Sequence, residues 1–151
     1  MYTIKNLSYL IQKRKILNNI NLDIKPNSFL SIIGPNGCGK STLMKTINRN
    51  IDIQEGIITL NNRDIKKFED KELALKRSVL QQSFFFPYNF RAIEIVEMGL
   101  YAYSLDLKYK KNILNYIIEK LNIKSLANED YQGLSGGEKQ KIQFARVVVQ
   151  L

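Results

Sequence analysis

Apolar and polar residues alternate through much of the first 60 or so residues, and this alternation predicts β-strands. Residues 2–9 alternate loosely, as in an edge strand, and residues 20–24 alternate strictly, as in a strand with one buried face. Residues 29–33 form a short apolar run, the pattern of a strand buried on both faces of a parallel sheet. Residues 56–60 predict another short strand. The N-terminal part is therefore predicted to be a β-rich core.

Farther along the chain the pattern becomes helical. Residues 66–77 are charged with a few spaced apolar positions, which predicts a surface helix, and residues 78–80 predict a return to the sheet. An aromatic loop follows at residues 83–90. Beyond it, apolar residues recur at helical spacing in 93–100 and more strongly in 113–121. We therefore expect the β-rich core to give way to a helical subdomain near residues 83–90.

A glycine-rich stretch, the lysine loop (residues 34–42), follows the apolar run and fits the phosphate-binding pattern G-x-x-x-x-G-K-[ST]. Glycines allow the backbone N–H groups to approach phosphate oxygens, and the start of a helix favours an anion. We expect Lys40 to reach the β- and γ-phosphates, Ser41 to ligate Mg²⁺ and Thr42 to bond the α-phosphate. Cys38 is expected to be a small filler rather than a nucleophile. The predicted nucleotide site comprises Gly34, Pro35, Asn36, Gly37, Cys38, Gly39, Lys40, Ser41 and Thr42.

A second glycine motif, the signature motif, opens the last predicted helix; it consists of Leu134, Ser135, Gly136, Gly137 and Glu138. Ser135 and Glu138 are three residues apart, the spacing of a capping box. The two glycines between them leave the positive end of the helix bare. This end is therefore a second candidate site for a phosphate group.

Composition narrows the class of protein. The chain has 151 residues, 44% hydrophobic and 25% charged, which suits one globular domain or part of a larger one. No stretch has the length of a membrane span or of a signal peptide, and a single cysteine agrees with a reducing compartment. The net charge of +9 could serve nucleic-acid binding, but the basic residues are spread along the chain rather than gathered in a run.

Taken together, the lysine loop, Gln82 and the signature motif resemble the ATP-binding subunit of ABC transporters. The match runs from Ile4 to the last residue. Segments 77–82, 96–99 and 143–151 and the pair Phe86–Pro87 are similar to ATPases of haem and iron-chelate importers. The resemblance implies an α/β fold, the P-loop NTPase core of ABC type, with a mixed sheet around the P-loop strand and helix and an α-helical subdomain.

The resemblance also implies a domain division. It predicts a single ABC ATP-binding domain over residues 1–151 whose core lacks its C-terminal part. Residues 1–83 are the expected β-rich core with the P-loop, residues 84–135 the helical subdomain, and residues 135–151 the signature helix.

The mechanism implied by the resemblance uses ATP and Mg²⁺ between two copies of the domain, arranged head to tail. Each ATP lies between the lysine loop of one copy and the signature motif of the other, where Ser135 and the N–H groups of Gly136 and Gly137 touch the γ-phosphate. Lys40 and Gln82 are the expected catalytic residues, and Ser41 and Gln82 the expected magnesium contacts. Implied partners are a homodimeric second subunit, membrane permease subunits and, indirectly, a solute-binding protein, with no nucleic acid. The implied location is peripheral, on the cytoplasmic face of the inner membrane.

Some expected features of the family are missing from the sequence. No run of four apolar residues is followed by Asp-Glu, and there is no histidine, so the general base and the switch residue are absent. We therefore expect weak nucleotide binding without turnover. Ile11 stands where an aromatic residue usually stacks on adenine, with Tyr9 nearby, so the adenine contact stays open.

Two alternatives compete with an importer ATPase. One is a truncated, hydrolysis-incompetent nucleotide-binding relic. The other is a soluble ABC ATPase acting on nucleic acid, to which the charge of +9 would be relevant. The transported solute cannot be read from this subunit, since the binding protein and permease select it.

Overall fold

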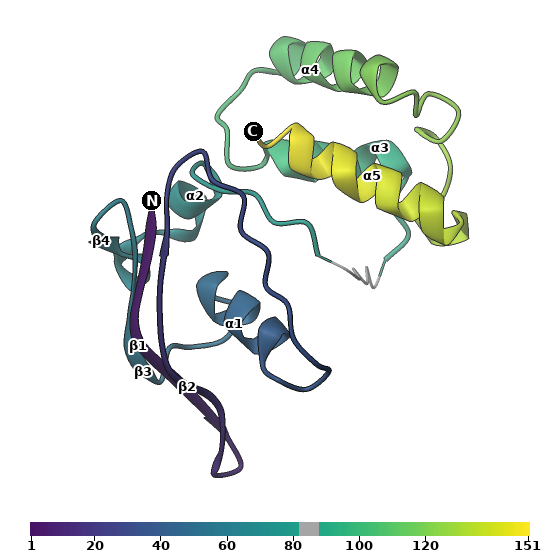
Figure 1. Cartoon of the computed structure of the whole chain (residues 1–151). Helices are drawn as coiled ribbons and strands as arrows, with labels where there is room; N and C mark the ends of the chain where they lie inside the picture. Colours follow the sequence, from purple (N-terminus) through teal and green to yellow (C-terminus); the bar gives the residue numbers. More distant parts are fainter. Residues whose placement is uncertain (82–87) are drawn as a thin grey trace. The chain divides into compact units, whose positions relative to one another are not determined.

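The computed structural model describes residues 1–81 and 88–151. They form two compact units, Met1–Phe68 and Glu69–Leu151 (Figure 1). The boundary predicted near residues 83–90 falls largely in the stretch 82–87, outside the described residues. The three-part division of the sequence into core, subdomain and signature helix stays a prediction.

The first unit is built on a four-stranded sheet with the order β2-β1-β3-β4. Its strands are β1 (Tyr2–Ile11), β2 (Arg14–Ile24), β3 (Glu55–Leu60) and β4 (Arg63–Asp64), and every neighbouring pair is antiparallel. The prediction that the first strand lies at an edge is wrong, because β1 pairs with both β2 and β3. Its alternation is loose because register shifts interrupt the pairing between Ile4 and Leu10, not because one edge faces solvent.

Two-residue turns close both hairpins. Gln12 and Lys13 have φ of 48° and 67°, and Asn61 and Asn62 have φ of 49° and 63°. Positive φ at both positions matches the right-handed twist of the strands. Asn6 also has positive φ, at the bulge in β1, and the facing Gly56 cannot carry a side chain because a Cβ there would lie 2.5 Å from the Asn6 carbonyl oxygen.

The apolar run 29–33 is not a strand, so the prediction of a buried parallel strand is wrong. Phe29 is 94% exposed and Ile33 is 91% exposed, and the described sheet contains antiparallel pairs alone. Residues 78–80 likewise form no strand in this structure, although a return to the sheet was predicted. Both errors have one cause: a buried parallel strand requires parallel neighbours, and the described residues supply none.

Helix α1 (Lys40–Ile47) follows the lysine loop and buries Leu43, Thr46 and Ile47. These side chains share the core of the unit with apolar residues of the sheet such as Ile4 and Ile58. The helix is thus fixed to the sheet through its inner face while its first turn stays at the surface. The unit ends with the short helix η1 (Ile65–Lys67).

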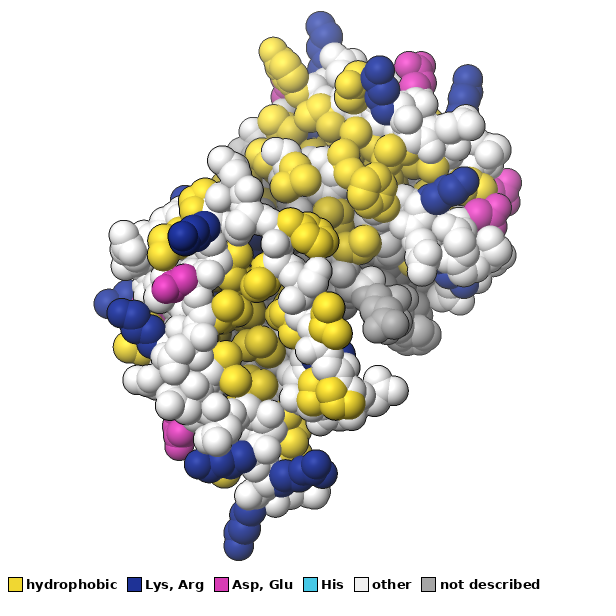
Figure 2. Space-filling model, in the orientation of Figure 1, with side chains coloured by type: hydrophobic (Ala, Val, Ile, Leu, Met, Phe, Trp, Pro, Cys, Tyr) yellow, Lys and Arg dark blue, Asp and Glu magenta, His cyan; other side chains and the backbone are white. Residues whose placement is uncertain are grey.

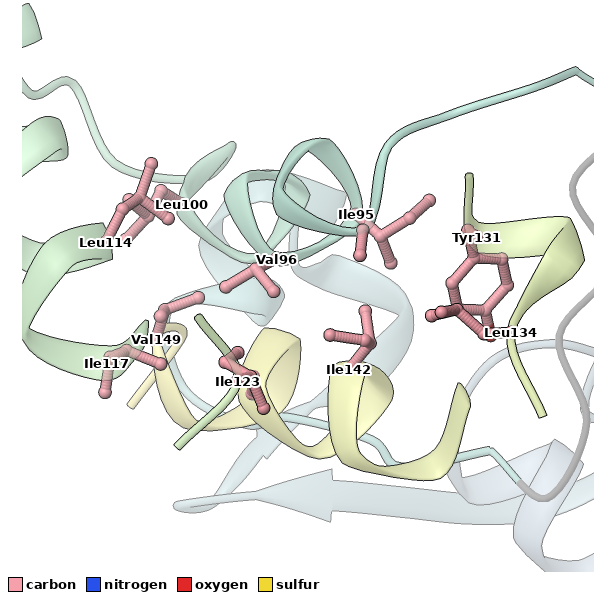
Figure 3. Close-up of a cluster of buried hydrophobic side chains, with 12 residues drawn as sticks. Ile95, Val96, Leu100, Leu114, Ile117, Ile123, Tyr131, Leu134, Ile142 and Val149 are labelled. Carbon is pink, nitrogen blue, oxygen red and sulfur yellow. The ribbon is translucent and has the colours of Figure 1, made fainter. Parts of the chain in front are cut away.

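The second unit is helical. Its elements are α2 (Asp70–Ala74), α3 (Ala92–Glu97), η2 (Met98–Leu100), α4 (Leu107–Lys120), η3 (Tyr131–Gly133) and α5 (Gly136–Val148). The helix predicted over 66–77 is present as two short pieces, η1 and α2. The apolar faces predicted in 93–100 and 113–121 are confirmed, since Val96, Leu100, Leu114 and Ile117 belong to one buried cluster (Figure 3).

Helix α5 runs through the middle of this cluster. Ile142 and Ala145 are fully buried, and Ile142 faces Ile95 of α3 in Figure 3. Close approach of η2 to α5 depends on Gly99, because a Cβ there would lie 2.2 Å from the Arg146 carbonyl oxygen. No helix in residues 1–81 and 88–151 is both long and apolar enough to cross a membrane.

Candidate functional site

The lysine loop owes its shape to two glycines. Gly37 has φ of 79° and Gly39 has φ of 100°, conformations that residues with a side chain rarely adopt. They differ in their surroundings: a Cβ at Gly37 would meet nothing within 4 Å, whereas one at Gly39 would lie 2.8 Å from the Ile16 carbonyl oxygen of β2. Gly39 therefore lets the loop pack against the sheet, and Gly37 leaves open space above it.

The first turn of α1 presents unused donors. Gly39 is the N-cap and has no side chain to accept a hydrogen bond, and the turn carries no acidic residue. Leu43 N–H donates to the Gly39 carbonyl at 2.9 Å, but in the described structure no backbone acceptor is found for the N–H groups of Lys40, Ser41 and Thr42. Such a helix start, with its dipole, is suited to an anion.

Lys40 folds back over the loop. Its Nζ donates to the carbonyl oxygens of Gly34 at 2.7 Å and of Pro35 at 2.8 Å, and lies 3.9 Å from the Cys38 Sγ. An ammonium group has three N–H donors, so two of them hold the side chain over the loop while the third has only the weak thiol contact. The lysine is therefore held on the loop with a donor left for an oxyanion.

The remaining polar groups fit a nucleotide with a magnesium ion. Ser41 is exposed at the helix start, and Thr42 is half-buried. Among the residues that the structure describes, no cluster of three or more His, Cys, Asp or Glu side chains could hold a metal ion. The hydroxyl of Ser41 is of the kind that can serve as one ligand of Mg²⁺, which proteins commonly hold through one or two side chains together with substrate phosphates. Cys38 is exposed and its Sγ lies 2.8 Å from the point where a Cβ on Gly34 would be, so it fills the space beside that glycine.

The signature motif forms the predicted capping box at the start of α5. Ser135 Oγ accepts from Glu138 N–H at 3.4 Å, while Glu138 Oε2 accepts from Ser135 N–H at 2.8 Å and from Ser135 Oγ–H at 2.6 Å. These bonds from the Ser135 hydroxyl and backbone N–H lower the pKa of the Glu138 carboxyl. Ser135 is consequently fixed with its hydroxyl at the very start of the helix.

Gly136 and Gly137 pack against none of the residues that the structure describes. A Cβ at either position would meet nothing within 4 Å, and neither glycine has positive φ. Both are exposed, whereas Leu134 beside them is buried in the core of the helical unit. A glycine required neither by conformation nor by packing leaves room for a group from outside the chain.

A groove runs alongside this bare helix start. Its lining includes Gly136, Gly137, Lys139, Lys141 and the half-exposed Phe144. Sequence reasoning did not single out the two lysines. Lys139 donates to the Gln132 carbonyl oxygen at 2.8 Å, so its charge lies beside the motif. A signal was available, since both lysines fall within five residues of the second glycine.

The structure thus presents two bare helix starts, one in each unit. The first lies in the unit Met1–Phe68 and the second in the unit Glu69–Leu151. Gln82 is the other residue predicted to be catalytic and to bind magnesium. It lies outside the described residues, as does most of the predicted aromatic loop. At the predicted adenine position, Ile11 is 49% exposed at the end of β1, and Tyr9 is half-buried.

Comparisons with known proteins agree on one family. The family model described as ABC transporter matches residues 17–151. The hemin import ATP-binding protein HmuV of Pseudoalteromonas translucida is 37% identical over all of this chain and 59% of its own length. The HmuV of Rhizobium meliloti is also 37% identical, over 58% of its length. The chain therefore spans somewhat more than half the length of these curated relatives.

Solved structures give the same fold. A dimeric ATP-binding cassette in a post-hydrolysis state with ADP and Pi superposes with a TM-score of 0.81 at 27% identity, covering 99% of this chain and 70% of that one. A metal-chelate type ABC transporter in an inward-facing conformation superposes with a TM-score of 0.74 at 24% identity, covering 99% and 55%. The predicted fold class, the P-loop core of ABC type with a helical subdomain, is confirmed by these matches.

Proposed function

Because this chain belongs to the ABC transporter family, we propose that it is the ATP-binding subunit of an importer, coupling ATP to the uptake of haem or another iron chelate. The relatives named for hemin import support the substrate class, since they match the chain over its whole length. In this proposal the reaction is inferred from the family, and the binding sites are inferred from the residues of this chain.

One observation carries the nucleotide site: three N–H groups at the start of α1 have no backbone acceptor in the described structure, and Lys40 in the same turn bonds the loop carbonyls of Gly34 and Pro35. The phosphates of ATP would take these donors, with Lys40 at the β- and γ-phosphates and Ser41 on Mg²⁺. The loop residues Gly34 to Thr42 would enclose the phosphate chain. Bound Mg²⁺ would neutralise charge on the phosphate oxygens.

The signature motif would serve a second copy of the chain. Ser135 and the N–H groups of Gly136 and Gly137 would meet the γ-phosphate held by a partner, with Leu134 anchoring the turn in the core and Glu138 holding Ser135 in place. The open space around both glycines supports this, as does the dimeric cassette among the structural relatives. Partners would include a second such subunit and permease subunits, with a solute-binding protein acting indirectly. The chain would then lie at the cytoplasmic face of the cell membrane.

Turnover by this 151-residue sequence alone is not expected. It contains neither an apolar run ending in Asp-Glu nor any histidine, so the expected general base and switch residue beside Lys40 and Ser41 are missing from it. We therefore propose a nucleotide-binding module in which Gln82 would sense the metal and the attacking water. Binding without hydrolysis is the specific expectation.

A fluorescent ATP analogue tests the site. Binding is expected to saturate, to require Mg²⁺, and to be lost in Lys40→Ala. Lys45→Ala is the matched control, because Lys45 is an exposed lysine on the same helix, one turn farther along. Equal loss in both variants, or no binding by the wild type, would contradict the proposed site. A Lys40-dependent ATPase rate from the purified chain would contradict the absence of turnover.

A further inference from the structure

The short helix η3 leads directly into the signature motif and is anchored in the helical unit. Tyr131 of η3 is 5% exposed and belongs, with Leu134, to the buried cluster of this unit (Figure 3). Its backbone is tied down as well, since Tyr131 N–H donates to the Phe90 carbonyl oxygen at 2.9 Å. The position of η3 therefore sets where the chain enters the signature motif.

A buried glutamine of α5 reaches back to this turn. Gln143 is 5% exposed, and its Nε2 donates to the Tyr131 hydroxyl at 2.9 Å. Its Oε1 accepts from Arg146 Nε at 2.8 Å, so both ends of the amide are used. A buried amide that donates at one end and accepts at the other is fixed in one orientation. Gln143 thus joins the turn before the motif to a point about two turns into the helix after it.

Lys139 holds the same turn through a second contact. Its Nζ donates to the Gln132 carbonyl oxygen at 2.8 Å and lies 5.9 Å from the centre of the Tyr131 ring, within reach of a cation–π contact. Lys139 and Gln143 are four residues apart on α5, so they lie on one face of the helix. Two side chains of one helix face therefore hold η3 against α5.

We propose that Gln143 is a positioning residue for the signature motif. By fixing η3 on α5, it sets the direction in which Ser135 and the N–H groups of Gly136 and Gly137 face a bound phosphate. The two glycines have no side chains to restrict their backbone, so this direction depends on the elements that hold the motif at either end. The inference rests on the proposed function, in which a second copy of the chain holds that phosphate.

Gln150, just after α5, offers a matched comparison for a role in stability alone. Its Nε2 donates to the carbonyl oxygens of Ala74 at 2.8 Å and of Arg77 at 3.1 Å, at the far end of the helix from the motif. Leucine at either glutamine removes hydrogen bonds that tie α5 to another segment, so both variants are expected to lower the midpoint of urea unfolding. Gln143→Leu alone is expected to loosen the signature motif.

NMR order parameters of the backbone amides of residues 135–137, measured on the full chain, test the positioning role. They are expected to fall from about 0.85, typical of a rigid backbone, to below about 0.6 in Gln143→Leu. Tyr131→Phe is expected to lower them too, and the double variant no further than Gln143→Leu, because both changes remove the same bond. Gln143→Glu is expected to keep the wild-type values, since a carboxylate can accept from both the Tyr131 hydroxyl and Arg146. Gln150→Leu is expected to leave them unchanged.

Sedimentation with ATP and Mg²⁺ tests the use of the motif by a second copy. The wild type is expected to pair, and Gln143→Leu is expected to pair about tenfold more weakly while its lysine loop binds the fluorescent ATP analogue as before. Unchanged order parameters in Gln143→Leu, or equal loosening in Gln150→Leu, would overturn the positioning role. Order parameters that respond as expected in a chain that does not pair with ATP would support the positioning of the turn and contradict the proposed function.

Discussion

The two glycines with positive φ in the lysine loop should respond differently to the same substitution. Alanine at Gly37 introduces strain in the backbone alone, because the space around it is open. Alanine at Gly39 introduces the same kind of strain and also places a methyl group 2.8 Å from the Ile16 carbonyl oxygen and 3.1 Å from a methyl carbon of Leu17. The comparison isolates the contact that joins the loop to the sheet.

The magnitudes follow from these two causes. A left-handed conformation costs a residue with a side chain about 1–2 kcal/mol, and overpacking against fixed neighbours costs about 1–3 kcal/mol. Reduced freedom of the unfolded chain returns about 0.4–1 kcal/mol in both variants. Gly37→Ala should therefore lower the free energy of unfolding by about 0–1.5 kcal/mol, and Gly39→Ala by about 1–4.5 kcal/mol.

Urea unfolding measures the difference, followed by NMR signals of β1 and β2 so that the sheet unit is observed by itself. Binding of the fluorescent ATP analogue gives a second readout. The methyl group at Gly37 would occupy the open space above the loop, so that variant should lose binding despite its small effect on stability. The reasoning would be refuted if the two variants differed in stability by less than about 0.5 kcal/mol, or if Gly37→Ala were the less stable one.

Three further predictions concern a close helix contact, a buried hydrogen bond and the capping box. Gly99→Ala should lower the free energy of unfolding by about 1–3 kcal/mol, because the added methyl group would overlap the Arg146 carbonyl oxygen. The control Gly133→Ala, whose added methyl group would meet no described atom within 4 Å, should change the free energy of unfolding by less than about 0.5 kcal/mol. Thermal unfolding of the two variants measures the difference. Thr46→Val should cost about 0.5–1.5 kcal/mol in urea unfolding, because the buried hydroxyl loses its 2.8 Å bond to the carbonyl oxygen one turn earlier; an unchanged midpoint would contradict this. Ser135→Ala should raise the pKa of Glu138 toward its ordinary value of 4.5, as measured by NMR titration. Because the pKa of Glu138 is lowered in the folded protein, its ionised carboxylate stabilises the fold at pH values above the ordinary pKa. This stabilisation is lost as the pH falls through the pKa of the folded state. A Ser135→Ala variant in which Glu138 titrates as in the wild type would contradict the capping box.

Local features of the fold could be predicted from sequence where the cause is local. The capping box of Ser135 and Glu138 depends on residues three apart, and it forms as predicted. The strand at 56–60 and the apolar faces in 93–100 and 113–121 follow from periodicity, and they too are confirmed. In each of these features the signal that predicts it lies within a few residues along the chain.

Features that depend on distant partners could not be predicted in the same way. Residues 29–33 have the composition of a buried strand, but a strand exists only where another strand pairs with it. The position of β1 inside the sheet also depends on β3, more than 40 residues away. In the candidate site, the pattern G-x-x-x-x-G-K-[ST] indicated the bare helix start. The contact of Gly39 with β2 and the return of Lys40 to the loop carbonyls needed coordinates.

Exposed hydrophobic side chains are found on both units. Figure 2 shows hydrophobic side chains gathered over parts of both units rather than scattered singly. In the helical unit one such patch lies between α4 and α5, where Leu105, Tyr116 and Val148 line an open groove. Exposed apolar area of this kind commonly marks a surface that another molecule covers.

Asparagine residues contribute to the conformational stability of this chain. Of the nine residues other than glycine that have positive φ in the described ranges, six are asparagine. Asparagine tolerates this conformation better than most residues, and unlike glycine it keeps the disordered chain from sampling the full range of backbone angles. Replacing the asparagines at the β3–β4 turn with glycine would relieve local strain but would raise the conformational entropy of the unfolded chain. The asparagines therefore stabilise the folded state partly by restricting the backbone of the unfolded state.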